Sequence, residues 1–119
     1  MPEKDRKDFF LYVDEFQNFI TDSFATILSE ARKYRLCLTI AHQYIAQLTS
    51  LESEKIKNAI FGNVGSIITF RVGATDSELL EKELQPVLKE NFLDLDSRQI
   101  IAKLSVSNRT LSPLSLIHI

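Results

Sequence analysis

Two adjacent carboxylates, Asp14 and Glu15, directly follow the apolar run Phe9–Val13. This run is preceded by the charged residues 4–8, and its composition predicts a strand buried on both faces of a sheet. In open parallel sheets, ligand sites lie at the carboxyl ends of strands, where this pair would lie. One carboxylate there could hold Mg²⁺, usually through water, and the other could polarise a water molecule that attacks a phosphate. The alternative is a core strand followed by a solvated acidic turn.

The next elements would bring a polar amide to the same edge. A second apolar run, residues 36–41, predicts a strand that ends at His42 and Gln43. The segment between the two runs has apolar residues at helical spacing, namely Phe24, Ile27, Leu28, Ala31 and Tyr34. A strand, a helix and a strand with short connections form a βαβ unit, whose strands pair in parallel. Gln43 is therefore expected beside the two carboxylates.

The rest of the chain continues the alternation of helices and strands. We expect a helix that ends near Phe61, a strand at residues 66–72, a helix that starts near residue 75 and ends or bends at Pro86, a loop at 91–97 and an edge strand at 99–106. This order predicts an α/β fold with a mostly parallel sheet and flanking helices.

Composition sets limits on the class of protein. The 119 residues are 45% apolar and 25% charged, which is ordinary for a soluble globular domain. A net charge of −2 gives no electrostatic argument for nucleic-acid or membrane binding, so contacts with DNA would need local loops or further sequence. The single Cys37 cannot form an internal disulfide, and its apolar neighbours predict a buried thiol in a reducing compartment. Without a signal peptide or a membrane-length apolar run, we expect a cytoplasmic chain.

The last six residues, Leu-Ser-Leu-Ile-His-Ile at 114–119, differ in character from the polar stretch before them. They are also what CTG TCT CTT ATA CAC ATC encodes, which resembles the transposon end used as an adapter in sequencing libraries. Our hypothesis is that they are a read-through scar and that native sequence stops near Pro113. The alternative is a native apolar tail that forms another strand. His118 is not a site candidate in either case.

Residues 9–48 resemble the Walker B half of the conjugative coupling-protein ATPases of type IV secretion, which belong to the HerA/FtsK group of RecA-like P-loop motors. The matching motifs are Asp-Glu-Phe-Gln-Asn-Phe at 14–19, Ser-Glu-Ala-Arg-Lys-Tyr at 29–34 and Ala-His-Gln at 41–43. A looser resemblance continues from residue 67 to about residue 106. The resemblance implies that residues 1–113 are the C-terminal half of a RecA-like ATPase domain.

The resemblance also implies roles for individual residues. Asp14 would coordinate Mg²⁺, Glu15 would orient the hydrolytic water, and Gln43 would sense the γ-phosphate of ATP. Arg32 is similar in position to the arginine finger, which reaches the nucleotide of the adjacent subunit in a ring, and Arg71 has a weaker claim to this role. Arginine suits the task because its charge is permanent and its fork can clamp phosphoryl oxygens.

Simpler interpretations of two of these residues are open. Arg32 could be a solvated helix residue paired with Glu30 or Asp14. His42 is expected to be a packing residue beside the site, because no cysteine or second nearby histidine indicates a metal cluster.

The sequence departs from the family in one respect, because it has no Gly-rich phosphate loop of the form G-x-x-x-x-G-K-[ST]. Its three glycines lie at 62, 65 and 73, and no lysine follows them at the required spacing. We expect this loop to precede residue 1, which makes Met1 an internal methionine of a longer chain. The polypeptide alone should then hydrolyse no ATP, because the backbone N–H groups that grip the phosphates are missing.

By the same resemblance, the intact protein would use ATP hydrolysis to move DNA through a homo-oligomeric ring, expected to be a hexamer, during conjugative transfer. Its partners would include membrane components of the secretion system, and sequence before residue 1 could anchor it to the inner membrane. Two other classes stay open: another P-loop ATPase, of the ABC or helicase type, and a non-enzymatic α/β interaction module with an incidental acidic edge.

Overall fold

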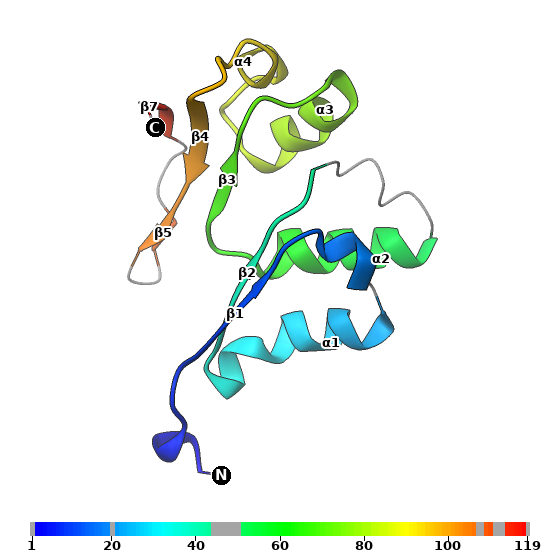
Figure 1. The fold of residues 1–119 in the computed structure, drawn as a ribbon, viewed down its shortest axis with the longest axis vertical. Coiled ribbons are helices and arrows are strands. Elements are labelled where there is room, and N and C mark those ends of the chain that lie inside the picture. Colours follow the sequence, from blue (N-terminus) through cyan, green and yellow to red (C-terminus); the bar gives the residue numbers. More distant parts are fainter. Residues whose placement is uncertain (1, 20, 44–50, 107–108, 111–113, 119) are drawn as a thin grey trace. The chain divides into compact units, whose positions relative to one another are not determined.

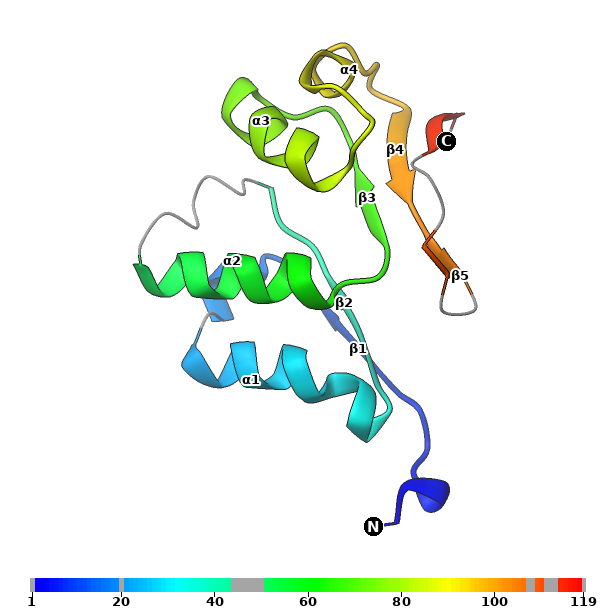
Figure 2. The same ribbon diagram turned by 180° about the vertical axis from the view of Figure 1, so that it is seen from behind.

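The computed structural model describes residues 2–19, 21–43, 51–106, 109–110 and 114–118 (Figures 1 and 2). The chain divides into two compact units, Met1–Asn63 and Val64–Ile119.

The first unit is built around two parallel strands, β1 (Phe9–Val13) and β2 (Leu36–Ile40), which pair in register from Phe9 opposite Leu36 to Val13 opposite Ile40. Between them the chain forms the 3-10 helix η2 (Phe16–Phe19), α1 (Asp22–Glu30) and the 3-10 helix η3 (Ala31–Tyr34). A short 3-10 helix, η1 (Glu3–Asp5), precedes β1, and α2 (Leu51–Asn63) ends the unit. The predicted order of strand, helix and parallel strand is confirmed.

The core of this unit lies between one face of the strands and the two helices. Its buried members are Phe16, Phe24, Leu28 and Ile56, which come from η2, α1 and α2. Val13, Leu38 and Ile40 of the strands pack against this cluster. In the parallel register these three strand residues share one face, because side chains alternate between the faces of a sheet. The helices therefore cover one face of the pair.

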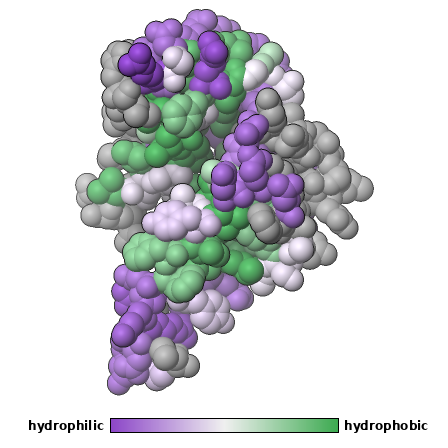
Figure 3. Space-filling model, viewed as in Figure 1, coloured by the Kyte–Doolittle hydropathy of each residue, from purple (hydrophilic) through white to green (hydrophobic). Residues whose placement is uncertain are grey.

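The expectation that β1 is buried on both faces is wrong for this chain. Phe10 and Tyr12 are 61% and 73% exposed, and they point to the face opposite the helices. Cys37 and Thr39 of β2 lie on this same uncovered face, so Cys37 is exposed rather than buried as predicted. Apolar surface accordingly gathers over β1 in Figure 3. We call the face formed by Phe10, Tyr12, Cys37 and Thr39 the bare face.

The second unit contains β3 (Ile67–Thr69), α3 (Ala74–Glu83), α4 (Lys89–Leu93) and β4 (Gln99–Lys103). The short strands β5 (Ser105–Val106) and β6 (Arg109–Thr110) form an antiparallel pair, and β7 (Leu114–His118) follows. A three-stranded sheet has the order β3-β4-β7, and both of its pairings are antiparallel. The predicted parallel pairing therefore holds for β1 and β2 but not for the strand pairs of this unit.

Two further expectations are corrected in the second unit. Residues 99–106 were expected to form one edge strand, but they form β4 and β5, and β4 lies in the centre of its sheet between β3 and β7. Its residues Ile100, Ile101 and Ala102 are all buried. The segment 91–97, expected to be a loop, begins inside α4, whose Phe92 is fully buried. The backbone of residues 114–118, which our hypothesis assigns to an adapter, pairs with β4 as β7.

Candidate functional site

The carboxyl ends of β1 and β2 are tied together by main-chain hydrogen bonds. The Ala41 N–H donates to the Val13 carbonyl at 2.9 Å, and the Phe16 N–H donates to the Ala41 carbonyl at 3.2 Å. These bonds continue the parallel pairing beyond the strands, so the residues that follow β1 and β2 leave the sheet side by side. This junction holds three of the predicted site residues.

The backbone turns sharply at Glu15, whose φ of 51° lies in the left-handed region. This conformation is unfavourable for a residue with a Cβ, by about 1–2 kcal/mol. The Glu15 N–H donates to Oδ1 of Asp14 at 2.9 Å, and the 3-10 helix η2 starts at the next residue. The turn therefore places two consecutive carboxylates at the strand end and ties the first to the main chain of the second.

The Gln43 side chain reaches across from the end of β2 to the end of β1. Its Nε2 donates a hydrogen bond to Oε1 of Glu15 at 3.0 Å. Glu15 is half-buried, whereas Asp14 and Gln43 are exposed. The described hydrogen bonds thus join Gln43 to Glu15 and join Asp14 to the main chain of Glu15. An amide from one strand and a carboxylate from its neighbour meet at one edge, which is the juxtaposition expected from the sequence.

Phe16 anchors this edge to the core. It is 1% exposed, its ring stacks on Phe24 with centroids 6.0 Å apart, and the ring of His42 meets it edge-on at 4.9 Å. His42 is half-buried and packs beside the site, as expected. Because Phe16 follows Glu15 and His42 precedes Gln43, this one aromatic contact positions the backbone of both site residues.

Arg32 lies far from this edge. It is exposed on η3, which precedes the amino end of β2, whereas Gln43 follows the carboxyl end. Five residues of strand at about 3.3 Å each separate these ends by roughly 16 Å. The structure therefore does not bring Arg32 to Asp14, Glu15 or Gln43 within one chain, and the alternative of an Arg32–Asp14 pair is not formed.

The amino ends of the strands carry an ion pair that the sequence analysis missed. Nε of Arg35 lies 2.7 Å from Oδ1 of Asp8, and both side chains are 46% exposed. The hydrogen bond to Asp8 and the attraction of its charge raise the pKa of Arg35. Each residue directly precedes its strand, so the parallel register itself could have identified the pair. Nearby, Arg6 donates to the Lys33 carbonyl and lies 5.1 Å from the centre of the Tyr34 ring.

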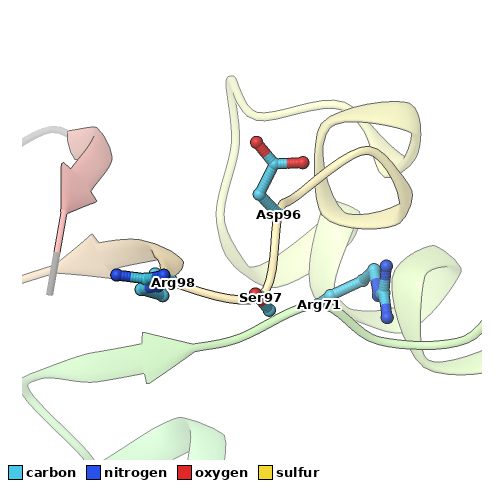
Figure 4. Close-up of a pocket in the computed structure, with 4 residues that line it drawn as sticks. All are labelled: Arg71, Asp96, Ser97 and Arg98. Atoms are coloured by element: carbon cyan, nitrogen blue, oxygen red, sulfur yellow. The ribbon is translucent and has the colours of Figure 1, made fainter.

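Arg71, the weaker candidate for an arginine finger, belongs to the second unit. It is exposed, it follows β3, and it lines a cavity of about 510 Å³ together with Asp96, Ser97 and Arg98 (Figure 4). Sequence reasoning did not single out the other three residues, which lie in a stretch expected to be loop and strand start.

The described part of the chain contains neither a metal cluster nor a membrane-spanning helix. No three or more His, Cys, Asp or Glu side chains there form a group that could hold a metal ion. Among the described helices, none has the length and apolar character needed to cross a membrane.

The chain resembles solved structures over its whole length. It matches the bacterial conjugative coupling protein TrwBdeltaN70, in an unbound monoclinic form, with a TM-score of 0.73 and 17% identity over 100% of this chain and 34% of that one. It matches VirB4 of Thermoanaerobacter pseudethanolicus with a TM-score of 0.68 and 14% identity over 98% of this chain and 33% of that one. The chain therefore shares an α/β fold with about a third of each structure.

No curated protein matches the chain. The family described as "TraM recognition site of TraD and TraG" matches residues 8–82, which is more than half of the chain and includes Asp14, Glu15, Arg32 and Gln43. The resemblance to conjugative coupling proteins of type IV secretion is confirmed, and the chain belongs to the family of the TraM recognition site of TraD and TraG.

Proposed function

We propose that this chain is the C-terminal half of a RecA-like ATPase domain in a conjugative coupling protein, and that Asp14, Glu15 and Gln43 act there on Mg²⁺-bound ATP. The observation that carries the proposal is the hydrogen bond between Gln43 and Glu15 at the carboxyl ends of two parallel strands. Ligand sites of open parallel sheets lie at such ends. The family match and the likeness to TrwBdeltaN70 support the same assignment.

Glu15 is the residue that orients the attacking water in this proposal. Its carboxylate is held by the Gln43 amide on one side, and its backbone is fixed by the left-handed turn. A γ-phosphate oxygen would be a second acceptor for the same amide hydrogens. The Gln43 amide could therefore move its hydrogen bond from Glu15 to the phosphate. This exchange would free the Glu15 carboxylate to accept a proton from water only when ATP is present.

Asp14 fits the role of the metal carboxylate. It is exposed beside Glu15, and its Oδ1 already accepts one hydrogen bond from the main chain. Mg²⁺ in nucleotide sites is held by one or two carboxylates, with water and phosphate oxygens as the other ligands, so a single aspartate is sufficient. When bound, the ion neutralises charge on the phosphates. The backbone cradle for the phosphates would come from outside this sequence.

Arg32 is proposed to act on the nucleotide of a neighbouring subunit. Its exposed position at the opposite end of β2 from Gln43 rules out contact with the site of its own chain. Arg32 can therefore act on a nucleotide only if a second copy of the protein places its own active site beside Arg32, as in a ring. The hexamer expected from the family resemblance would provide this arrangement.

An exposed apolar face such as the bare face is expected if the chain is part of a larger domain. A parallel pair with large apolar side chains on an uncovered face is unusual, because parallel sheets are buried on both faces. The chain spans about a third of the structures it resembles, so other parts of the intact protein would cover this face.

The partners of the intact protein are proposals of the same kind. The family description names TraM, and we propose that a TraM-like protein is recognised by the intact protein. DNA is the proposed cargo, and membrane components of the secretion system are the proposed docking partners. The cytoplasm is the proposed location, with an inner-membrane anchor in sequence outside this chain.

The proposal is tested with Glu15→Gln in the intact protein. The variant should bind Mg²⁺-ATP with nearly unchanged affinity and should lose roughly 10²–10⁴-fold in kcat, because it removes the proton acceptor and not the phosphate grip. Glu78→Gln, the same change at an exposed position on α3, is the matched control and should keep full activity. Unchanged kcat in Glu15→Gln would exclude the assignment.

A second candidate function is a recognition module without catalysis, which the family description as a recognition site favours. The genomic sequence before Met1 distinguishes the two. A Gly-rich phosphate loop after an apolar strand supports the ATPase, and its absence over a few hundred residues favours the module.

A further inference from the structure

A cluster of cationic and hydrogen-bonding groups lies at one edge of the sheet in the second unit, and it shares no residue with the proposed ATPase site. Because β3 and β4 are antiparallel, the end of β3 and the start of β4 lie at the same edge. Arg71 follows the first and Arg98 directly precedes the second. These two arginines, with Asp96 and Ser97, line the cavity of about 510 Å³.

The turn that carries Ser97 and Arg98 adds main-chain donors. The Gln99 N–H donates to the Asp96 carbonyl at 3.1 Å, and Oε1 of Gln99 accepts from the Asp96 N–H at 3.0 Å. Ser97 and Arg98 are the two central residues of this turn. Within the described residues, their own N–H groups have no hydrogen-bond acceptor. Main-chain N–H groups in such turns commonly bind anions.

The arginines themselves are available for a ligand. Among the described residues, neither Arg71 nor Arg98 forms an ion pair with a carboxylate. Both side chains are exposed. Figure 4 shows them on opposite sides of Ser97, with their guanidinium groups directed away from each other. This arrangement suits an extended anion with several negative groups better than a single small ion.

We propose that this cavity binds consecutive phosphate groups of one ligand, with Arg71 and Arg98 contacting phosphates at its two ends and Ser97 donating between them. Arginine forms bidentate, charge-assisted hydrogen bonds to phosphate oxygens. Asp96 reduces the net positive charge and can accept a hydrogen bond from a sugar or base. Two sources carry such phosphates: the polyphosphate of a nucleotide and the backbone of a single-stranded nucleic acid.

The proposal is tested on this chain itself by recording amide chemical shifts during titration with inorganic tripolyphosphate, at constant ionic strength. We expect saturable shifts of the amides of Arg71, Ser97 and Arg98. Arg71→Gln and Arg98→Gln should each weaken binding about tenfold, as expected for loss of a charge-assisted hydrogen bond. Lys82→Gln, an exposed charge removal on α3, should not change the affinity.

Parallel titrations with Mg²⁺-ATP and with an oligothymidylate identify the source of the phosphates. The probe whose chemical-shift changes saturate at the lower concentration identifies the ligand class. Saturation by either Mg²⁺-ATP or the oligothymidylate supports the site. Shifts that do not saturate with any probe, or that persist unchanged in the double variant with a native-like spectrum, would overturn it. Because the experiment does not involve Asp14, Glu15 or Gln43, its failure leaves the proposed ATPase site untouched.

Discussion

At the scale of single residues, the Gln43–Glu15 hydrogen bond is the contact on which the proposed chemistry depends. A neutral amide and a carboxylate at 3.0 Å form a pair that a phosphate oxygen can disrupt by competing for the same N–H, since each amide hydrogen serves one acceptor at a time. Binding of a phosphate ligand could therefore control whether the Glu15 carboxylate is hydrogen-bonded to Gln43 or is free to act on water.

Replacement of Gln43 should separate phosphate sensing from binding. In the intact protein, Gln43→Ala should lower kcat by about tenfold or more while the affinity for Mg²⁺-ATP changes little, and Gln43→Glu should be worse because it places a like charge beside Glu15. Steady-state ATPase assays and nucleotide-binding titrations check this. Gln85→Ala, at an exposed position of the second unit, serves as the control. Equal activity of Gln43→Ala and wild type would contradict the sensing role.

Arg32 gives a prediction that depends on assembly. Arg32→Ala should reduce ATP turnover only under conditions in which the intact protein forms rings, because its side chain lies at the opposite end of β2 from its own site. Activity is compared above and below the concentration at which rings form, with Lys33→Ala from the same 3-10 helix as the control. An equal loss in monomers would refute action across the interface.

At the scale of elements, the site is positioned by the junction of β1 with η2, and Phe16 is the residue that fixes this junction to the core. Sequence periodicity identified the strand, helix and strand that build the edge, because local apolar spacing is sufficient to define them. It predicted apolar anchors in the loop after the strand but did not single out Phe16 among them, since a residue in a loop gives no periodic signal. The left-handed backbone at Glu15 was equally invisible, because that conformation usually selects glycine or asparagine.

Truncation of Phe16 should destabilise the first unit. Phe16→Ala is expected to lower its free energy of unfolding by about 3–5 kcal/mol, as for other fully buried phenylalanines. Phe70→Ala, at a position 55% exposed in the second unit, should have an effect below about 1 kcal/mol. Urea denaturation followed by circular dichroism measures both. A similar effect of the two substitutions would contradict the anchoring role of Phe16.

The uncovered side of the strand pair gives a prediction about association. Phe10 and Tyr12 of β1 form an exposed apolar surface, and the edge of β1 that faces away from β2 pairs with no described strand. Both features promote self-association. Combined Phe10→Lys and Tyr12→Lys substitutions should shift the isolated chain toward the monomer in light scattering after size-exclusion chromatography. Ile27→Lys on α1, at a position 43% exposed, should leave the association unchanged. Unchanged association in the double variant would exclude the bare face as the contact.

At the scale of the whole molecule, the chain consists of two units, and the proposed site lies in the first of them. The βαβ order of that unit was predictable because its apolar runs and helical spacing are local patterns, and a helical connection between two strands implies parallel pairing. The antiparallel sheet of the second unit was not, because β3 and β4 pair across more than thirty residues and the apolar run 100–102 fits an edge or a central strand equally well. The exposure of β1 was also unpredictable, since its composition is typical of a strand within a larger sheet.

The isolated chain should not be an ATPase. It contains carboxylates and an amide that suit hydrolysis but no Gly-rich loop to hold the phosphates. We therefore expect no Mg²⁺-dependent release of phosphate from ATP above that of the Glu15→Gln form of the same chain. Turnover that disappears in Glu15→Gln would contradict this expectation.

The Asp8–Arg35 ion pair at the amino ends of the strands has a consequence for the opposite edge. It favours one alignment of β1 along β2, in which Phe9 lies opposite Leu36. A slip by a single residue would separate the two charges, advance Glu15 by about 3.3 Å and exchange the two sides of the strand. Insertion or deletion of one amino acid within β1 would thus disable the carboxylate from a distance, without altering any residue that touches it.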